Sequence, residues 1–261
     1  MLPVALIAAC LSLDSCRKNA NGRNTLNLVD DATVLSLSGQ EYSKFLSTNP
    51  PITGTAEAEM VRRVGSRMAT AVQNYLAAKG QSDLVKDFNW EFNLVSSNEV
   101  NAWCMPGGKI VVYSGILPVT QTDSGLAVVM GHEIAHAVLK HGSEQMSQQL
   151  VVEYGGAALS TLLSTNPSGT SELFKSVYGV STTLGTLAHS RKQESEADEM
   201  GLYFMATASY DPNTAVSFWQ RMQAQSGGSS TPVFLSTHPS DATRIKNIQD
   251  LLPKALEYYH P

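Results

Sequence analysis

The hexapeptide GHEIAH, residues 131–136, lies in a run from Asp123 to Gly142 whose apolar residues have the spacing of a largely buried helix. Residues four apart on a helix share a face, so the imidazoles of His132 and His136 can converge on one ion. Zn²⁺ takes imidazole and carboxylate ligands and keeps one position for water in catalytic sites, which makes Glu133 a candidate base. The alternative is an ordinary helix with surface or core histidines. Unpaired polar groups in a buried helix cost about 1 to 3 kcal/mol each, which favours the metal site.

The acidic segment RKQESEADE, residues 191–199, is the strongest source of a third ligand. Glu194 and Asp198 are four residues apart and share a helix face, whereas Glu196 and Glu199 lie around the helix. This spacing suits Glu194 as a ligand and Asp198 as an acceptor that orients a ligand imidazole through its other nitrogen. The alternative is a solvated helix face. Histidine offers further candidates at His141, His189 and His238.

HEIAH followed downstream by ESEADEMGL, residues 194–202, resembles the HExxH zinc endopeptidases that include the CAAX prenyl protease, the heat-shock membrane protease HtpX and many periplasmic bacterial lipoproteins. The resemblance implies that His132, His136 and Glu194 bind one Zn²⁺ per chain, with Glu133 as the base and Asp198 behind the ligands. It extends from about residue 16 to residue 252.

The same resemblance includes STHP, residues 236–239, and Arg244, which match the family's His-Pro pair and downstream arginine. It implies that His238 and Arg244 steady the oxyanion of the tetrahedral intermediate. For His238 two interpretations stay open. It donates to the oxyanion, an effect worth about 2.7 to 4 kcal/mol where such donors have been removed, or it occupies the open zinc position at rest and must swing away. A His-Pro helix start without a catalytic part is the remaining alternative.

Two strands are expected before the metal helix. NWEFNLV, residues 89–95, alternates apolar and polar residues, and KIVVYS, residues 109–114, follows a Pro-Gly-Gly turn. The segment 101–117 is similar to the family's edge strand, so Asn101, Gly107, Gly108 and Ile110 are expected to contact an extended substrate. The alternative is an ordinary sheet strand.

The N-terminus resembles a bacterial lipoprotein signal. Residues 2–13 form an apolar run too short to span a bilayer. Leu-Asp-Ser precedes Cys16, which is the predicted lipidation site. Cys10 ends a second, competing lipidation motif. We therefore expect a signal peptide at residues 1–16, a tether and N-terminal arm at 17–54, and the metallopeptidase domain at 55–261. The three cysteines predict no disulfide framework, and Cys104 is expected to be a small buried or half-buried residue. His189 is expected to be structural or to support the ligands.

Composition narrows the class of protein. With 18 basic and 23 acidic residues and a net charge of −5, the chain gives no sign of nucleic-acid binding. Its 261 residues, 43% of them hydrophobic, can form one sizeable core. We predict an α+β, mainly helical zincin-like domain with a small sheet beside the metal helix.

The resemblance further implies the location and the substrates. We expect a lipid-anchored, membrane-bound protease of the bacterial periplasm, on the outer membrane, that hydrolyses unfolded or misfolded envelope proteins in quality control. One alternative is a latched, zinc-bound envelope chaperone or assembly factor with little turnover. The other is a lipid-anchored binding module in which HEIAH is accidental.

Overall fold

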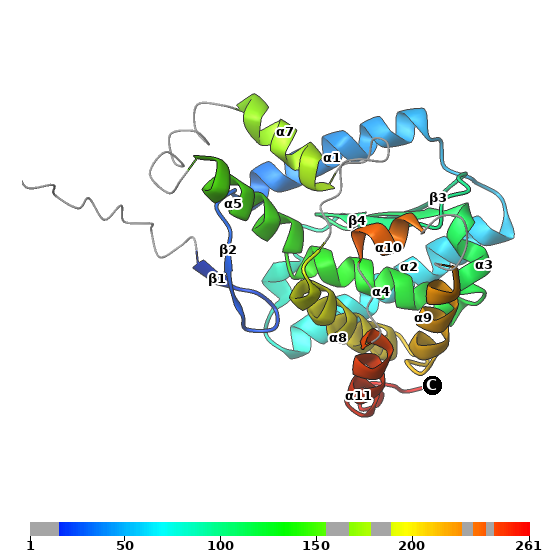
Figure 1. Cartoon of the computed structure of the whole chain (residues 1–261). Coiled ribbons are helices and arrows are strands. Elements are labelled where there is room, and N and C mark those ends of the chain that lie inside the picture. The colour runs from blue at the N-terminus through cyan, green and yellow to red at the C-terminus, as the bar shows by residue number, and fades with distance from the viewer. Residues whose placement is uncertain (1–15, 155–166, 179–188, 226–231, 239–242) are drawn as a thin grey trace, which may run out of the picture.

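The computed structural model describes residues 16–154, 167–178, 189–225, 232–238 and 243–261. Helices dominate and a three-stranded sheet lies among them (Figure 1), which confirms the predicted α+β class. Of the predicted signal peptide only Cys16 falls within the described residues, and its lipidation stays a prediction. Among the helices of these ranges, none has both the length and the apolar character that crossing a membrane requires.

The elements follow one another along the chain as two groups of strands and a longer series of helices. The strands are β1 (Cys16–Lys18), β2 (Asn24–Leu26), β3 (Glu91–Val95), β4 (Ala102–Met105) and β5 (Lys109–Tyr113). The helices are α1 (Asp31–Thr48), α2 (Ala56–Ala78), α3 (Leu117–Thr120), α4 (Asp123–Val138), α5 (His141–Tyr154), α7 (Pro167–Tyr178), α8 (Arg191–Thr207), α9 (Thr214–Gln225), α10 (Val233–Thr237) and α11 (Arg244–Leu256).

The sheet beside the site has the strand order β3-β5-β4, with β3 parallel and β4 antiparallel to β5. Ile110, predicted to contact substrate, lies in the central strand β5 and is fully buried. Gly107 and Gly108 lie in the β4–β5 turn with φ of 83° and 78°, where glycine is favoured, and a Cβ on Gly108 would meet the Trp90 ring at 2.7 Å. The structure therefore corrects the prediction for these three residues: the available edge is β4 itself.

Helices cover both faces of this sheet (Figure 1). On one face, Tyr42 and Phe45 of α1 pack with Met105 and Val111. On the other face, the alternate residues of the strands join the main core formed with α2 and α4. Because α1 buries aromatic side chains against the sheet, residues 17–54, expected as a tether and arm, are built into the fold.

Helices α4 and α8, which carry the predicted ligands, approach each other closely through two glycines. A Cβ added to Gly201 of α8 would lie 2.9 Å from the carbonyl carbon of Gly131 and 2.9 Å from the backbone nitrogen of His132. A larger side chain at this crossing would force the helices apart. The glycine pair therefore sets the distance across which α4 and α8 present their polar residues to each other.

Polar caps fix where the two ligand-bearing helices begin. The Thr122 side chain accepts a hydrogen bond from the Gly125 backbone nitrogen at the start of α4. At the start of α8, Ser190 and Gln193 form a reciprocal capping box. Glu194 consequently lies in the first turn of α8, next to the capped end.

Candidate metal centre

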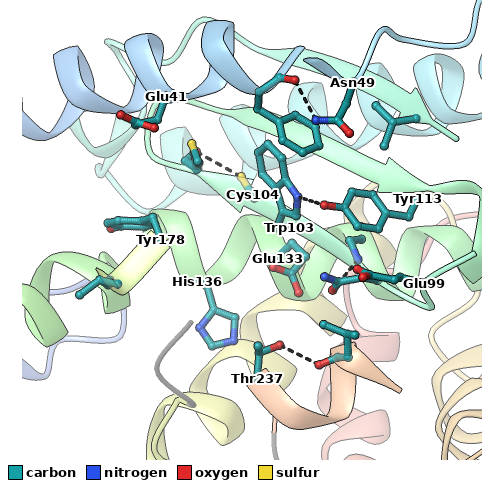
Figure 2. A pocket seen from close by; sticks show the side chains of 18 of the residues that line it. Glu41, Asn49, Glu99, Trp103, Cys104, Tyr113, Glu133, His136, Tyr178 and Thr237 are labelled. Atoms are coloured by element: carbon teal, nitrogen blue, oxygen red, sulfur yellow. Dashed lines mark hydrogen bonds between the residues drawn. The ribbon is translucent and has the colours of Figure 1, made fainter. Parts of the chain in front are cut away.

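A cavity of about 830 Å³ lies between β4, α1, α7 and α10 (Figure 2). Glu133 and His136 of α4 form part of its wall, close to Trp103 and Cys104 of β4. Of the four residues predicted to contact substrate, Asn101 lines this cavity. An extended chain lying along β4 would therefore reach Glu133.

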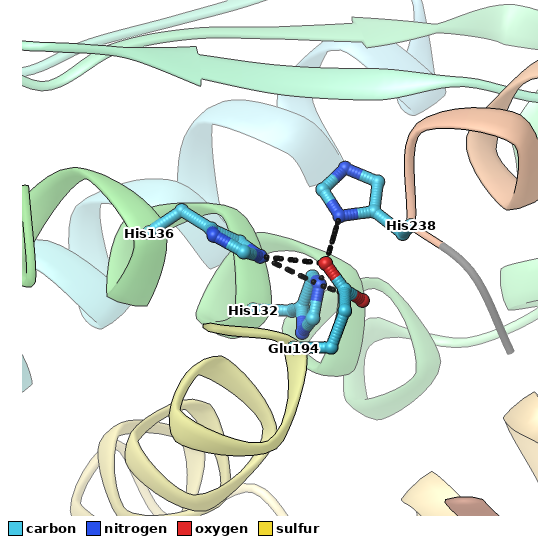
Figure 3. Close-up of side chains that lie close together, drawn as sticks. All are labelled: His132, His136, Glu194 and His238. Atoms are coloured by element: carbon cyan, nitrogen blue, oxygen red, sulfur yellow. Dashed lines mark hydrogen bonds and ion pairs between the residues drawn. The ribbon is translucent and has the colours of Figure 1, made fainter. Parts of the chain in front are cut away.

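Four side chains from three parts of the chain meet beside this cavity (Figure 3). They are His132 and His136 from α4, Glu194 from α8, and His238, which follows α10; one ligand atom of each lies within 4.8 Å of the others. His136 Nε2 is 3.1 Å from His132 Nε2 and 3.3 Å from Glu194 Oε1. The three predicted zinc ligands are thus brought together.

The atoms of this cluster fit a bound cation. Two Nε2 atoms face each other, and a pair of facing imidazole nitrogens needs a shared proton or a metal between them. Within the described residues, Glu133 Oε1 and Glu194 Oε2 are buried without a hydrogen bond, although His238 Nε2 and Arg244 Nη1 lie 3.2 Å and 2.9 Å away. Zn²⁺ held by His132, His136 and Glu194 would satisfy the Glu194 oxygen, since two imidazoles and a carboxylate are a common ligand set.

The electrostatics of the cluster point the same way. Three buried carboxylates, Glu133, Glu194 and Asp198, surround it together with one buried guanidinium, that of Arg244. Burial disfavours a charged His132, but the Glu194 carboxylate and the Asp198 hydrogen bond outweigh it and raise the pKa of His132 to about 9. Burial raises the pKa of Glu133. A site whose carboxylates draw a proton onto an imidazole also attracts a metal cation.

Asp198 and Arg244 contact the ligands but do not line the cavity. Asp198 Oδ1 lies 3.0 Å from His132 Nδ1, the arrangement expected of a residue that orients this imidazole. Arg244 Nε and Nη2 donate to Asp198 at 2.8 and 2.7 Å, and its Nη1 lies 2.9 Å from Glu194 Oε2. In this structure the nitrogens of Arg244 are directed at two carboxylates, and its contact with an oxyanion stays a prediction.

His238 lies inside the ligand cluster. Its Nδ1 is 3.2 Å from His132 Nε2 and 3.0 Å from Glu194 Oε1, while its Nε2 is 3.2 Å from Glu133 Oε1. The ring thus occupies the space between the base and the other ligands, which a reacting water and carbonyl would need. This geometry favours the interpretation of His238 as a resting ligand. Residues 239–242, with the proline of the His-Pro pair, lie outside the described residues.

Two further residues, His189 and Cys104, also border the site. His189 stacks on His136, with ring centroids 3.9 Å apart, and its Nδ1 lies 3.0 Å from Gln145 Nε2. Cys104 is a buried free thiol, as expected, and its Sγ donates to the Met105 carbonyl at 3.5 Å. Both residues form part of the cavity wall.

Sequence reasoning considered His141 only as a candidate third ligand and gave no role to Glu196; the structure places both behind His136. His141 Nδ1 lies 2.8 Å from His136 Nδ1, and His141 Nε2 lies 3.0 Å from Glu196 Oε2. On a continuous helix, residues five apart point about 140° away from each other. Lys140, with φ of 57°, instead ends α4 and turns His141 back. Only a helix break predicted at Lys140 would have indicated from the sequence that His141 lies next to His136.

Comparison with known proteins identifies related peptidases. A model described as peptidase family M48 matches residues 56–252. The chain is 36% identical over 189 residues to the mitochondrial metalloendopeptidase OMA1 of Schizosaccharomyces pombe, covering 72% of this chain and 53% of that protein. It is 34% identical over 179 residues to the mitochondrial metalloendopeptidase OMA1 of Bos taurus, covering 66% and 34%. It is 29% identical over 167 residues to the beta-barrel assembly-enhancing protease of Escherichia coli, covering 62% and 34%.

These relatives correct the predicted location. The chain spans about half of the fission-yeast protein and about a third of the other two. A lipoprotein of the bacterial periplasm was expected, whereas the relatives at 36%, 33% and 34% identity are mitochondrial, and the bacterial protease is less similar. The predicted periplasmic, outer-membrane location is therefore wrong. The predicted family is confirmed: the chain belongs to peptidase family M48.

Proposed function

We propose that the chain is a zinc-dependent endopeptidase that cleaves unfolded or misfolded polypeptides in protein quality control. The observation that carries the proposal is the meeting of His132, His136 and Glu194 beside a cavity whose wall includes Glu133. The names of the relatives, metalloendopeptidases and a protease, support the same reaction class.

The residues of the site divide the work of peptide hydrolysis. When held by His132, His136 and Glu194, Zn²⁺ supplies a Lewis acid that polarises the peptide carbonyl and makes a water molecule more acidic. Glu133 accepts a proton from the water and passes it to the leaving amine. Because Glu133 is buried, its pKa is raised, which makes the carboxylate a stronger base than one in water. Asp198 accepts from His132 Nδ1 and so leaves Nε2 as the ligand atom.

The edge strand β4 offers a binding track for an extended substrate. The Tyr113 backbone nitrogen donates to the Asn101 carbonyl at 3.1 Å, which makes these two residues a hydrogen-bonded pair. Since such pairs alternate along antiparallel strands, the backbone groups of Ala102 and Cys104 face away from β5. A peptide can add to this edge through main-chain hydrogen bonds.

The cavity wall next to this edge is rich in aromatic side chains. They are Phe45, Trp103, Tyr113, Phe174 and Tyr178. A wall of this kind takes up apolar side chains. Folded proteins bury both their apolar side chains and their strand backbones, so the site favours substrates that have lost their fold.

The latched chaperone stays the alternative function, because His238 occupies the reaction space. We expect His238→Ala, assayed with saturating zinc, to raise the rate of cleavage of an unfolded protein several-fold, since a blocked state must open before substrate binds. His260→Ala, at an exposed histidine near the C-terminus, is the matched control and should leave the rate unchanged.

A different result would change the role of His238. If this residue donates to the oxyanion, its removal should lower the rate by about 100- to 1000-fold. If wild type and His238→Ala both fail to cleave while they bind zinc, the chaperone function is favoured.

Metal content and chelation test the proposed function directly. We expect about one zinc per chain by elemental analysis of the purified wild type, since three protein ligands suit a catalytic site. A chelator should abolish cleavage of an unfolded protein substrate, and added zinc should restore it. Cleavage that persists in the metal-free protein would contradict a zinc-dependent mechanism.

A further inference from the structure

A continuous row of polar contacts runs from Nδ1 of His136 to the N-terminal hairpin formed by β1 and β2. His136 Nδ1 lies 2.8 Å from His141 Nδ1, and His141 Nε2 lies 3.0 Å from Glu196 Oε2. Glu196 in turn accepts from Arg23, at 2.6 Å from Nε and 3.0 Å from Nη2. Arg23 lies in the turn of the hairpin, just before β2, and α8 supplies Glu196. The hairpin is thereby connected to a predicted zinc ligand.

The direction of each hydrogen bond in this row follows from its two ends, a histidine that binds metal at one end and a carboxylate that can only accept at the other. If His136 binds the metal through Nε2, its Nδ1 carries the proton and donates to His141 Nδ1. His141 then carries its own proton on Nε2 and donates to Glu196, which accepts as a carboxylate. The row can therefore transmit the negative charge of Glu196 to His136, because each histidine donates from one ring nitrogen in the same direction along it.

Arg23 fixes the carboxylate at the end of the row. Its Nη1 and Nη2 also donate to Glu144, at 2.6 and 2.8 Å, so one guanidinium holds two carboxylates through its fork of donors. His141 is fully buried, and the side chains of Glu196 and Glu144 are 13% and 8% exposed. Opposing pairs in such partly buried surroundings hold their geometry better than fully exposed pairs do. A lysine could not make the same bridge, because it lacks the planar fork.

We propose that His141, Glu196 and Arg23 form a relay of positioning residues that orients His136 and strengthens its bond to zinc. The proposal rests on the zinc site proposed above. It extends that site to Arg23, which precedes the residues 56–252 matched by the family model. The N-terminal hairpin would then serve metal binding as well as packing.

The chain offers a matched pair of variants that separates this role from simple packing. Glu144 of α5 and Glu196 of α8 both pair with Arg23 at 2.6 Å. Within the described part of the chain Glu196 accepts from His141, while Glu144 accepts from Gln193 at 3.0 Å. A structural role predicts similar consequences for Glu144→Gln and Glu196→Gln, whereas the relay predicts different ones.

The experiment is a chelator competition that measures the zinc affinity of the full chain. In Glu196→Gln, the amide must turn its NH₂ group toward His141 or toward Arg23, both of which are donors, so the row is broken. We expect this variant to bind zinc about 10- to 100-fold more weakly than wild type, the usual cost of losing such a partner. Glu144→Gln should stay within about twofold of wild type, because the hydrogen bond from His141 is kept. Arg23→Lys should fall between the two variants.

A second readout does not depend on activity or affinity. The visible absorption of the Co²⁺-substituted protein reports the ligand geometry directly, and its bands should shift in Glu196→Gln but not in Glu144→Gln. Equal zinc affinity for wild type and Glu196→Gln, in proteins with the same circular dichroism, would overturn the relay. Equal weakening in both glutamine variants would also overturn it, in favour of packing alone. Failure of the wild type itself to bind zinc would instead contradict the proposed function.

Discussion

Glu133→Gln is expected to lower the rate of cleavage of an unfolded protein by about 100- to 10,000-fold, the range that general acid–base groups contribute. The substitution keeps the size of the side chain and removes its ability to accept a proton. Glu133 is buried in the wall of the cavity, and its Oε1 makes no hydrogen bond within the described part of the chain. His238 Nε2 lies 3.2 Å from this oxygen, so the carboxylate reaches a water molecule once the His238 ring has moved away. The measurement is the initial rate at saturating substrate.

The zinc content of Glu133→Gln shows whether a loss of activity comes from the missing base or from loss of the metal. Glu133 is not one of the three predicted ligands, so the variant should retain about one zinc per chain. Glu199→Gln is a suitable control, because Glu199 lies on α8 and contacts Tyr203 and Lys254 outside the site. Activity near wild type in Glu133→Gln would remove this residue from the mechanism.

The parts of the site that could be predicted are those set by local spacing. His132 and His136 share a helix face, as do Glu194 and Asp198, and both pairs depend only on helical periodicity. The α+β class followed from the same local patterns together with the family resemblance. These features do not require knowledge of which segments meet in space.

The parts that sequence reasoning missed depend on contacts between distant segments. Ile110 was expected at an edge, but the strand order places it in the centre of the sheet. The ion pairs of Arg244 with Asp198 and Glu194, which lie on another helix, were not predicted. Arg23 and Glu196 are 173 residues apart, and no periodicity connects them. Such pairings become visible only when α8 and the hairpin are placed together.

Glu194→Ala is expected to remove most of the bound zinc, from about one per chain to a small fraction, because a three-ligand site loses a third of its protein donors. Glu194 Oε1 lies 3.3 Å from His136 Nε2 and its Oε2 lies 3.5 Å from His132 Nε2; among the described residues, the other members of this ligand group are histidines. Elemental analysis of wild type and variant, purified side by side, gives the measurement. Cleavage activity should be lost together with the metal.

Stability provides an independent check on Glu194→Ala. A ligand that binds only the folded state stabilises it in proportion to the logarithm of its concentration over Kd, so a chelator should lower the Tm of wild type. The same chelator should have little effect on the Tm of Glu194→Ala, which has little zinc to lose. Removal of Glu194 also takes a partner from Arg244, and Glu194→Gln separates that effect because it keeps a side chain of equal size there. If both variants keep full zinc, Glu194 is not a ligand. If the wild type binds no zinc, the HEIAH motif does not form a metal site, and the binding-module alternative is favoured.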